Sequence, residues 1–285
     1  MPDRQIALLI DGGFFLKRLP RLVREARCNT PEKIAGCLRF MCRNHIKYIT
    51  GENGDRWHQH VYRIFYYDAV PYDEVAHHPL ENRQVSFGKS EIARRREQLF
   101  DTLRRQRNVA LRLGKVIRDG DWSITGPASR KLIATKKWVE GLDLSLLESH
   151  GVVRLNDWQQ KEALRLQKLW ASIENRHVKL PLKQKGVDMR IGLDIASLTL
   201  KRQVQTIVLV AGDSDFVPAA KLARREGVQF ILDPMWQSVN ADLFEHIDGL
   251  QSGLPKPKAP DNDNVEEQVE EIGAAEVTRN SAVSP

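Results

Sequence analysis

The segment Gln5-Ile-Ala-Leu-Leu-Ile10 is a short, continuous apolar run, and it stops at Asp11-Gly12-Gly13. Unbroken apolar runs of this length are typical of strands that are covered on both faces, as in parallel sheets. A second such run, Thr206-Ile-Val-Leu-Val210, is followed two residues later by Asp213 and Asp215. We therefore predict two buried strands, each followed closely by carboxylates.

Predicted strands and helices alternate along the rest of the chain. Cap and turn signals separate them, such as Thr30-Pro31-Glu32 at the start of one helix. No strand-rich second domain is expected, and the stretch from Pro71 to Asn82 is predicted to be a loop. This alternation indicates an α/β fold with a mostly parallel, doubly wound sheet flanked by helices. Further strands are expected at 61–67, 109–117 and 228–232, and helices at about 31–46, 89–107 and 216–225, from 156 or 157 onward, and from 188 onward.

The composition is that of an ordinary globular protein, with 285 residues of which 41% are hydrophobic and 28% charged. The sequence contains no apolar run long enough to cross a membrane, and its first residues lack the apolar stretch of a signal peptide. We therefore expect a cytoplasmic protein without membrane association. The three cysteines have no CxxC spacing, which predicts neither a disulfide framework nor a zinc site.

Charge is divided unevenly along the chain. The whole sequence carries +7, but residues 251–285 hold three bases and seven acids, net −4, so the remainder carries +11. A body this basic attracts polyanions such as nucleic acid, although a solubilising surface charge is the alternative. Residues 251–285 also lack aromatic side chains, which predicts a disordered acidic tail. Such a tail is either simply solvated or acts as an intramolecular mimic of RNA.

The acids that follow the two buried strands are expected to share one site. In open α/β sheets, ligands bind outside the carboxyl ends of the strands, where the strand order reverses. Repulsion among Asp11, Asp213 and Asp215 would raise their pKa values unless a cation neutralised them. Carboxylates favour Mg²⁺ or Mn²⁺ over zinc, and these ions support hydrolysis of phosphate esters. Gly12 suits close backbone approach to such a site, and Ser214 could hold a carboxylate or a water in place.

A fourth acid, Asp188, precedes a helical pattern. Lys185 and Gly186 beside it suit the approach of a phosphate. Each acid also has a simpler explanation, because Gly-Asp and Asp-Gly pairs are ordinary turn signals and an acid at the start of a helix can cap it. The residues alone leave both explanations open.

Four motifs stand in order along the chain. They are Ile10-Asp11-Gly12, Tyr66-Tyr67-Asp68-Ala69, Lys185-Gly186-Val187-Asp188 and Leu209-Val-Ala-Gly-Asp213-Ser-Asp215-Phe216. These motifs resemble those of NYN domains of the LabA-like group, within the PIN-like nuclease superfamily. The resemblance implies a PIN-like nuclease domain at residues 1–250, with a less typical helical segment at about 118–182, followed by the tail at 251–285. It also implies a catalytic metal site made of Asp11, Asp188, Asp213 and Asp215, with Asp194 and Ser214 supporting these ligands.

The resulting hypothesis is a metal-dependent endoribonuclease that hydrolyses RNA phosphodiester bonds through water activated by Mg²⁺ or Mn²⁺. Gly12, Lys185, Arg94 and Arg95 are predicted to contact the substrate, although the arginine-rich helix could equally be a solvated surface. Trp122 and Trp138 lie among basic residues, where they could stack on unpaired bases or pack inside the protein.

Two other functions are compatible with parts of the pattern. A nucleic-acid-binding regulator would keep the fold but cleave slowly or not at all. A small-molecule phosphatase of the HAD type would need a second aspartate where this chain has Gly13, so it fits less well. The sequence does not fix the oligomeric state or the choice between RNA and DNA.

Overall fold

The computed structural model describes residues 5–52, 55–124, 126–142 and 155–256. Within them the chain forms two compact units. The first unit contains residues up to 66, residues 102–110, and the chain from residue 191 onward. The second unit contains residues 67–101 and 111–190.

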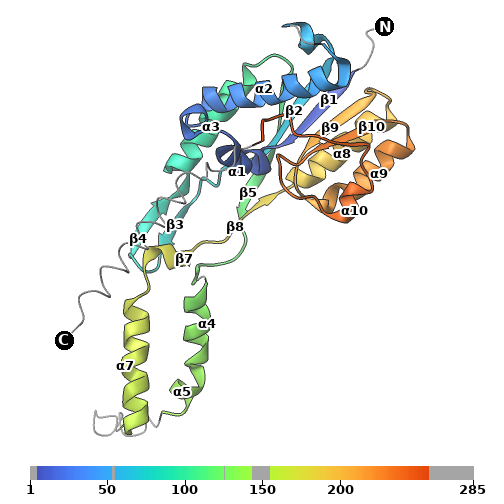
Figure 1. Ribbon diagram of the computed structural model, residues 1–285. Helices are drawn as coiled ribbons and strands as arrows, with labels where there is room; N and C mark the ends of the chain where they lie inside the picture. Colours follow the sequence, from blue (N-terminus) through green and yellow to red (C-terminus); the bar gives the residue numbers. More distant parts are fainter. Residues whose placement is uncertain (1–4, 53–54, 125, 143–154, 257–285) are drawn as a thin grey trace, which may run out of the picture. The chain divides into compact units, whose positions relative to one another are not determined.

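The described residues contain a seven-stranded sheet with the strand order β11-β10-β9-β1-β2-β5-β8. The pairs β1–β9, β9–β10 and β10–β11 are parallel, whereas β5–β8 is antiparallel. The predicted α/β fold with a mostly parallel sheet flanked by helices is therefore confirmed (Figure 1). The strands are β1 (Ile6–Asp11), β2 (Val61–Val70), β3 (Val75–His78), β4 (Arg83–Ser86), β5 (Val109–Arg118), β6 (Ser123–Ile124), β7 (Val178–Lys179), β8 (Leu182–Lys185), β9 (Thr206–Val210), β10 (Gln229–Asp233) and β11 (Gly249–Leu250).

Helices connect most of these strands. The α-helices are α1 (Gly12–Leu22), α2 (Pro31–Thr50), α3 (Glu91–Arg104), α4 (Pro127–Ala134), α5 (Lys136–Glu140), α7 (Asp157–Ala171), α8 (Val187–Leu200), α9 (Val217–Arg225) and α10 (Ala241–Phe244). Short 3-10 helices occur at η1 (Glu25–Arg27), η2 (Asp55–Gln59), η3 (Phe87–Lys89), η4 (Asn175–His177) and η5 (Ser214–Phe216). Among the described residues, none of the helices combines the length and the apolar character needed to cross a membrane.

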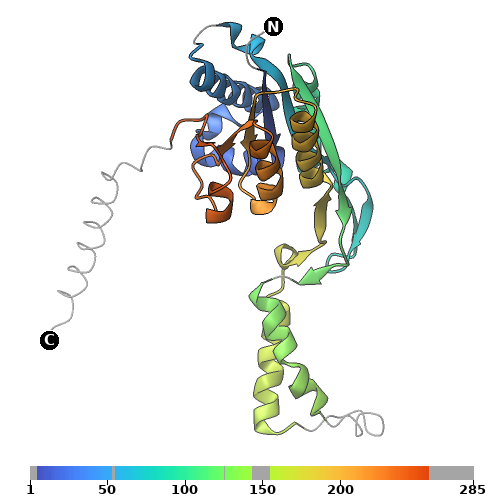
Figure 2. The same cartoon turned by 90° about the vertical axis from the view of Figure 1, so that its right-hand side faces the viewer.

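The core of the first unit lies around β1 and β9. Residues 6–10 and all of β9 are buried, and they pair in register from Ile6 with Thr206 to Ile10 with Val210. Strands buried on both faces need helices on both sides. In Figure 2 the blue helices α1 and α2 lie to one side of β1, and the gold helix α8 lies to the other. Both predicted strands are thus confirmed.

Helix α1 and the β3–β4 hairpin are among the elements of the structure that were not predicted. Helix α1 begins directly at Gly12, where the sequence indicated only a turn, because two glycines in the first turn weaken the helical pattern. The stretch predicted as a loop after Pro71 instead contains the hairpin β3–β4, whose turn places Asn82 at φ 50°. Exposed and buried positions alternate along β3, but two of its four residues are histidines, so the sequence does not show alternating apolar and polar residues.

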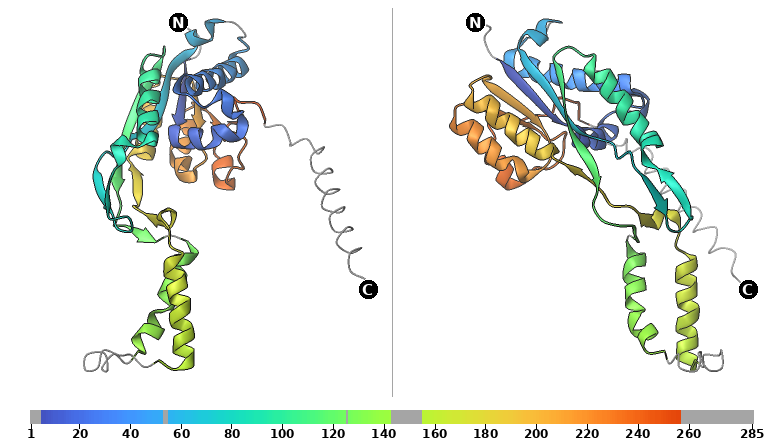
Figure 3. Two further views of the ribbon diagram at one scale, coloured as in Figure 1. Left: turned by 90° about the vertical axis from the view of Figure 1, so that its left-hand side faces the viewer. Right: turned by 180° about the vertical axis from the view of Figure 1, so that it is seen from behind.

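The second unit has a small aromatic core below the β3–β4 hairpin. The ring of Trp122 lies 4.7 Å from that of His78 and 6.5 Å from that of Phe87, between ring centroids. Trp122 therefore packs inside this unit, which is the alternative to base stacking that the sequence left open. Helices α4 and α7 of the same unit lie side by side (Figure 3). Asn156 begins α7 with a capping box, at the cap position that the sequence predicted.

The chain beyond β11 continues to pack on the first unit. The backbone N–H of Gln251 donates to the carbonyl of Leu232 at 3.0 Å, and the Asn44 amide donates to the carbonyl of Gly253 at 2.7 Å. The side chain of Leu254 is 3% exposed. Ordered contacts thus extend past the boundary predicted at residue 251, and residues 257–285 of the predicted tail lie outside the described residues.

A buried histidine–aspartate pair anchors this C-terminal segment. Nε2 of His45, on α2, lies 2.8 Å from Oδ2 of Asp233, at the end of β10, and both side chains are fully buried. The same carboxylate accepts the backbone N–H of Met235 at 2.7 Å and that of Gly253 at 2.9 Å. A β-carbon on Gly253 would lie 2.7 Å from the His45 ring, so only glycine fits there.

Candidate functional site

Three of the four predicted metal ligands follow the carboxyl ends of neighbouring strands. Strands β1 and β9 are parallel, and Ile10 pairs with Val210 at their last shared position. Asp11 is the next residue of β1, and the loop after β9 carries Asp213 and Asp215. Because parallel strands in register end at the same edge of the sheet, the two acidic segments start from one edge within the first unit.

Two of these acids also cap helices. Oδ1 of Asp11 accepts the backbone N–H of Phe14 at 3.0 Å at the start of α1, and Oδ1 of Asp213 accepts the backbone N–H of Asp215 at 3.1 Å at the start of η5. The simpler explanation offered by the sequence is therefore realised. It does not exclude metal binding, because a carboxylate has two oxygens and about four acceptor positions. Asp11 is half-buried, whereas Asp213 and Asp215 are exposed, so they are open to an incoming ligand.

A ring from α1 joins the two acidic segments. A β-carbon placed on Gly212 would lie 2.5 Å from Cε2 of Phe14, which shows that the Phe14 ring lies directly against the backbone of Gly212. Gly212 immediately precedes Asp213, and the backbone N–H of Phe14 donates to Oδ1 of Asp11. The contact therefore fixes the backbone beside Asp213 relative to the backbone beside Asp11.

Replacing Gly212 by alanine is expected to lower the free energy of unfolding by about 1–3 kcal/mol, as overpacking usually does. In a Phe14→Ala background the same change should cost less than about 1 kcal/mol, because the clashing ring is gone. Urea denaturation of the four proteins of this cycle measures the coupling. Additive effects of the two substitutions would contradict the contact.

Gly12 has a structural reason to be glycine. It is buried in the first turn of α1, and a β-carbon there would lie 2.6 Å from Cζ of the buried Tyr66 ring. Its predicted contact with substrate stays a prediction, and the packing on Tyr66 accounts for the residue type. Ser214 is half-buried at the start of η5, next to Asp213.

The fourth predicted ligand, Asp188, belongs to the second unit. It is exposed in the first turn of α8, where a carboxylate is favoured by the helix dipole. Gly186, with φ 79°, turns the chain from β8 into α8 and leaves Lys185 exposed. Asp194 lies further along α8, in the part that belongs to the first unit, and is half-buried.

A ready-made metal cluster is not present in the described part of the chain. Among residues 5–52, 55–124, 126–142 and 155–256, no three His, Cys, Asp or Glu side chains lie close enough together to hold a metal ion. The convergence of all four aspartates on one cation therefore stays a prediction. The donor chemistry fits a hard divalent cation, since every candidate ligand is a carboxylate.

The arginine-rich helix α3 divides its side chains between surface and interior. Arg94 and Arg95 are exposed, and Arg95 pairs with Glu91 one turn away at 2.6 Å. Arg96 instead points inward and forms an ion pair with the fully buried Asp68 at the end of β2. This pair was not predicted, although Arg96 lies between Ala93 and Phe100 at helical spacing and so falls on the buried face of α3. The predicted contacts of Arg94 and Arg95 with phosphate stay a prediction.

Comparison with known families gives one match. The family model of the NYN domain matches residues 145–246, a span that includes Lys185, Asp188, Asp213 and Asp215 but not Asp11. NYN domains are PIN-like, nuclease-type domains. No curated protein matches the chain, and no solved structure matches it.

Proposed function

We propose that this chain is a metal-dependent endoribonuclease of the NYN type, in its LabA-like group. Its ligands to Mg²⁺ or Mn²⁺ are Asp11, Asp188, Asp213 and Asp215. The observation that carries the proposal is the common edge of β1 and β9, from which Asp11 and the segment with Asp213 and Asp215 both start. The NYN match over residues 145–246 also supports it, because this span includes Asp188, Asp213 and Asp215.

The net charge of the chain favours a nucleic-acid substrate. The chain outside residues 251–285 carries a net charge of +11, which favours a polyanion over a neutral or cationic substrate. Exposed Lys185, Arg94 and Arg95 are suited to contact phosphates, and exposed Asp213 and Asp215 leave the site open to a long polymer. RNA is the proposed polymer on the resemblance of the four motifs to NYN domains.

A bound cation and the side chains of the site would have different roles in hydrolysis. A bound divalent ion supplies a water nucleophile at neutral pH and neutralises charge on the phosphodiester. The four aspartates would hold that ion, and the Phe14–Gly212 contact keeps two of their backbone segments in a fixed relation. Asp194 and Ser214 are proposed to orient these carboxylates. Lys185 would position the phosphate at the site.

The test is cleavage of an unstructured RNA by the purified full chain with Mn²⁺, with chelator as the control. We expect internal cuts that leave 3′-hydroxyl and 5′-phosphate ends, because water is the nucleophile. End-group analysis of the products distinguishes this from attack by the ribose 2′-hydroxyl. Products with 2′,3′-cyclic phosphates, or cleavage that persists in chelator, would contradict the metal-dependent mechanism.

A second candidate function is a nucleic-acid-binding regulator that cleaves weakly or not at all. It is favoured by the capping bonds of Asp11 and Asp213, which give these acids a structural role without catalysis. The same experiment separates the two functions. Salt-sensitive binding of the RNA without any cleavage in Mg²⁺ or Mn²⁺ would support the regulator.

A further inference from the structure

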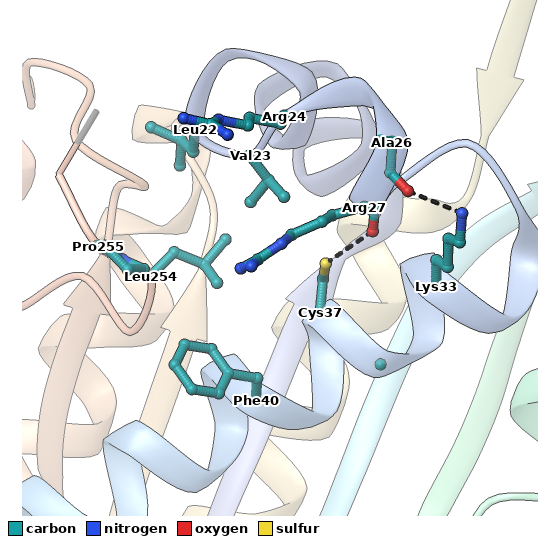
Figure 4. Close-up of a pocket in the computed structure, with 11 residues that line it drawn as sticks. Leu22, Val23, Arg24, Ala26, Arg27, Lys33, Cys37, Phe40, Leu254 and Pro255 are labelled. Atoms are coloured by element: carbon teal, nitrogen blue, oxygen red, sulfur yellow. Dashed lines mark hydrogen bonds between the residues drawn. The ribbon is translucent and has the colours of Figure 1, made fainter. Parts of the chain in front are cut away.

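One groove of the first unit differs in its chemistry from the acidic site described above, because it is apolar with a basic rim. Its volume is about 710 Å³, and it lies between α1, η1, α2 and the C-terminal segment. Figure 4 shows the Arg27 side chain extending into this groove, with Val23, Phe40 and Leu254 around it. Phe40 is 49% exposed, which is unusual for a phenylalanine on a helix that packs on a sheet.

The charged side chains that line this groove are all positive. Arg24, Arg27 and Lys33 line it, and no acidic residue does. Within the described ranges, none of these three bases pairs with a carboxylate, and Lys33 instead donates to the carbonyl of Ala26 at 2.7 Å. An occupant of this groove should therefore combine apolar side chains with negative charge.

The end of the chain has this combination of properties. Residues 261–271 contain six acids and no base. Val265, Val269 and Ile272 follow one another at spacings of four and three, the spacing that would bring them together as one apolar stripe if the segment formed a helix on binding. The acids Glu266, Glu267, Glu270 and Glu271 then fall outside this stripe.

The connection also has the right length. Leu254 and Pro255 themselves line the groove, so the described chain reaches the groove six positions before the acidic segment begins at Asp261. Val265 is ten positions after Pro255, and ten positions can span up to about 33 Å, which is enough to turn back onto α2. A tether of this length gives an effective concentration of about 1 mM, so even weak contacts would be populated.

We propose that residues 261–277 dock into this groove in the same molecule, with Val265, Val269 and Ile272 against Phe40, Val23 and Leu254. The glutamates beside this stripe then face Arg24, Arg27 and Lys33. The proposal does not depend on nuclease activity. It gives the acidic segment a binding place on its own chain.

Cysteine reactivity tests the docking. Cys37 lines the groove, whereas Cys28 is half-buried outside it. Burial raises the pKa of both thiols, so labelling with N-ethylmaleimide is slow enough to follow, and peptide mass spectrometry separates the two sites. In the intact chain Cys37 should react about fivefold more slowly than in a Val265→Asp, Val269→Asp, Ile272→Asp variant, as expected for an intrinsic Kd of about 0.25 mM at an effective concentration of about 1 mM.

A charge-matched variant completes the experiment. The changes Thr278→Asp, Asn280→Asp and Ser281→Asp add the same three charges beyond the stripe, and they should leave Cys37 as protected as in the intact chain. Cys28 should label at one rate in all three proteins. Protection should weaken as salt is added, because the rim contacts are ionic.

Three results would overturn the proposal. One is equal labelling of Cys37 in the intact chain and the stripe variant. Another is protection that rises with protein concentration, which would place the tail of a second copy in the groove. The third is protection of Cys37 only on addition of an oligoribonucleotide, which would assign the groove to nucleic acid.

Discussion

Replacing Asp213 by asparagine should lower the rate of Mn²⁺-dependent RNA cleavage by at least about 100-fold, since even indirect supports of a metal site cost about 10–100-fold when removed. The substitution separates two roles of this side chain. Asparagine caps a helix as well as aspartate does, so the bond to the Asp215 N–H is retained while the charge is lost. Initial rates on a labelled RNA, measured over a range of Mn²⁺ concentrations, give the effect.

The matched control is Asp242→Asn. Asp242 is an exposed acid in the first turn of α10, in the same unit, and it has no part in the proposed site. This variant should cleave at the unmodified rate. If Asp213→Asn kept its activity, or if both variants lost it equally, the carboxylate of Asp213 would not be a metal ligand.

Replacing Asp233 by alanine should lower the free energy of unfolding by about 3 kcal/mol or more, since each buried hydrogen-bonding group left unsatisfied costs about 1–3 kcal/mol. The change removes the partner of His45 and leaves the N–H groups of Met235 and Gly253 without their acceptor. The His45 and Asp233 side chains are both fully buried, so water cannot take the place of the carboxylate without opening the unit.

Urea denaturation followed by tryptophan fluorescence measures this loss. Asp242→Ala, which removes an exposed acid, is the control and should change the free energy of unfolding by no more than about 0.5 kcal/mol. A loss below about 1 kcal/mol for Asp233→Ala would mean that the pair contributes no more than an ordinary surface contact.

The strands that form the core could be read from the sequence because their signal is local. The run from Thr206 to Val210 coincides with β9 residue for residue, and the run before Asp11 coincides with the buried part of β1. The start of α1 could not be predicted, because its two glycines weaken the helical pattern. The β3–β4 hairpin could not be predicted either, because two histidines in β3 hide the alternation of apolar and polar residues. The strand predicted at 228–232 is displaced by one residue from β10 (Gln229–Asp233), and β11 was not predicted.

The candidate site was predictable only in part. That Asp11 and Asp213 would start from one sheet edge followed from two apolar runs and the rules of parallel sheets. Their capping bonds are local, and capping was one of the two explanations that the sequence left open. The Phe14–Gly212 contact instead joins segments about 200 residues apart, which no local pattern encodes. Nor does a local pattern indicate the pairing of Arg96 with Asp68 or of His45 with Asp233.

No side chain larger than that of glycine fits at position 253, and this limits which substitutions the chain can accept there. A β-carbon there would meet both the imidazole of His45 and the main-chain oxygen of Met41, each 2.7 Å away. Mutation to any other residue is therefore blocked by a helix that lies more than 200 positions earlier in the chain. Sequence drift and length variation at the carboxyl terminus should accordingly be confined to positions after this one.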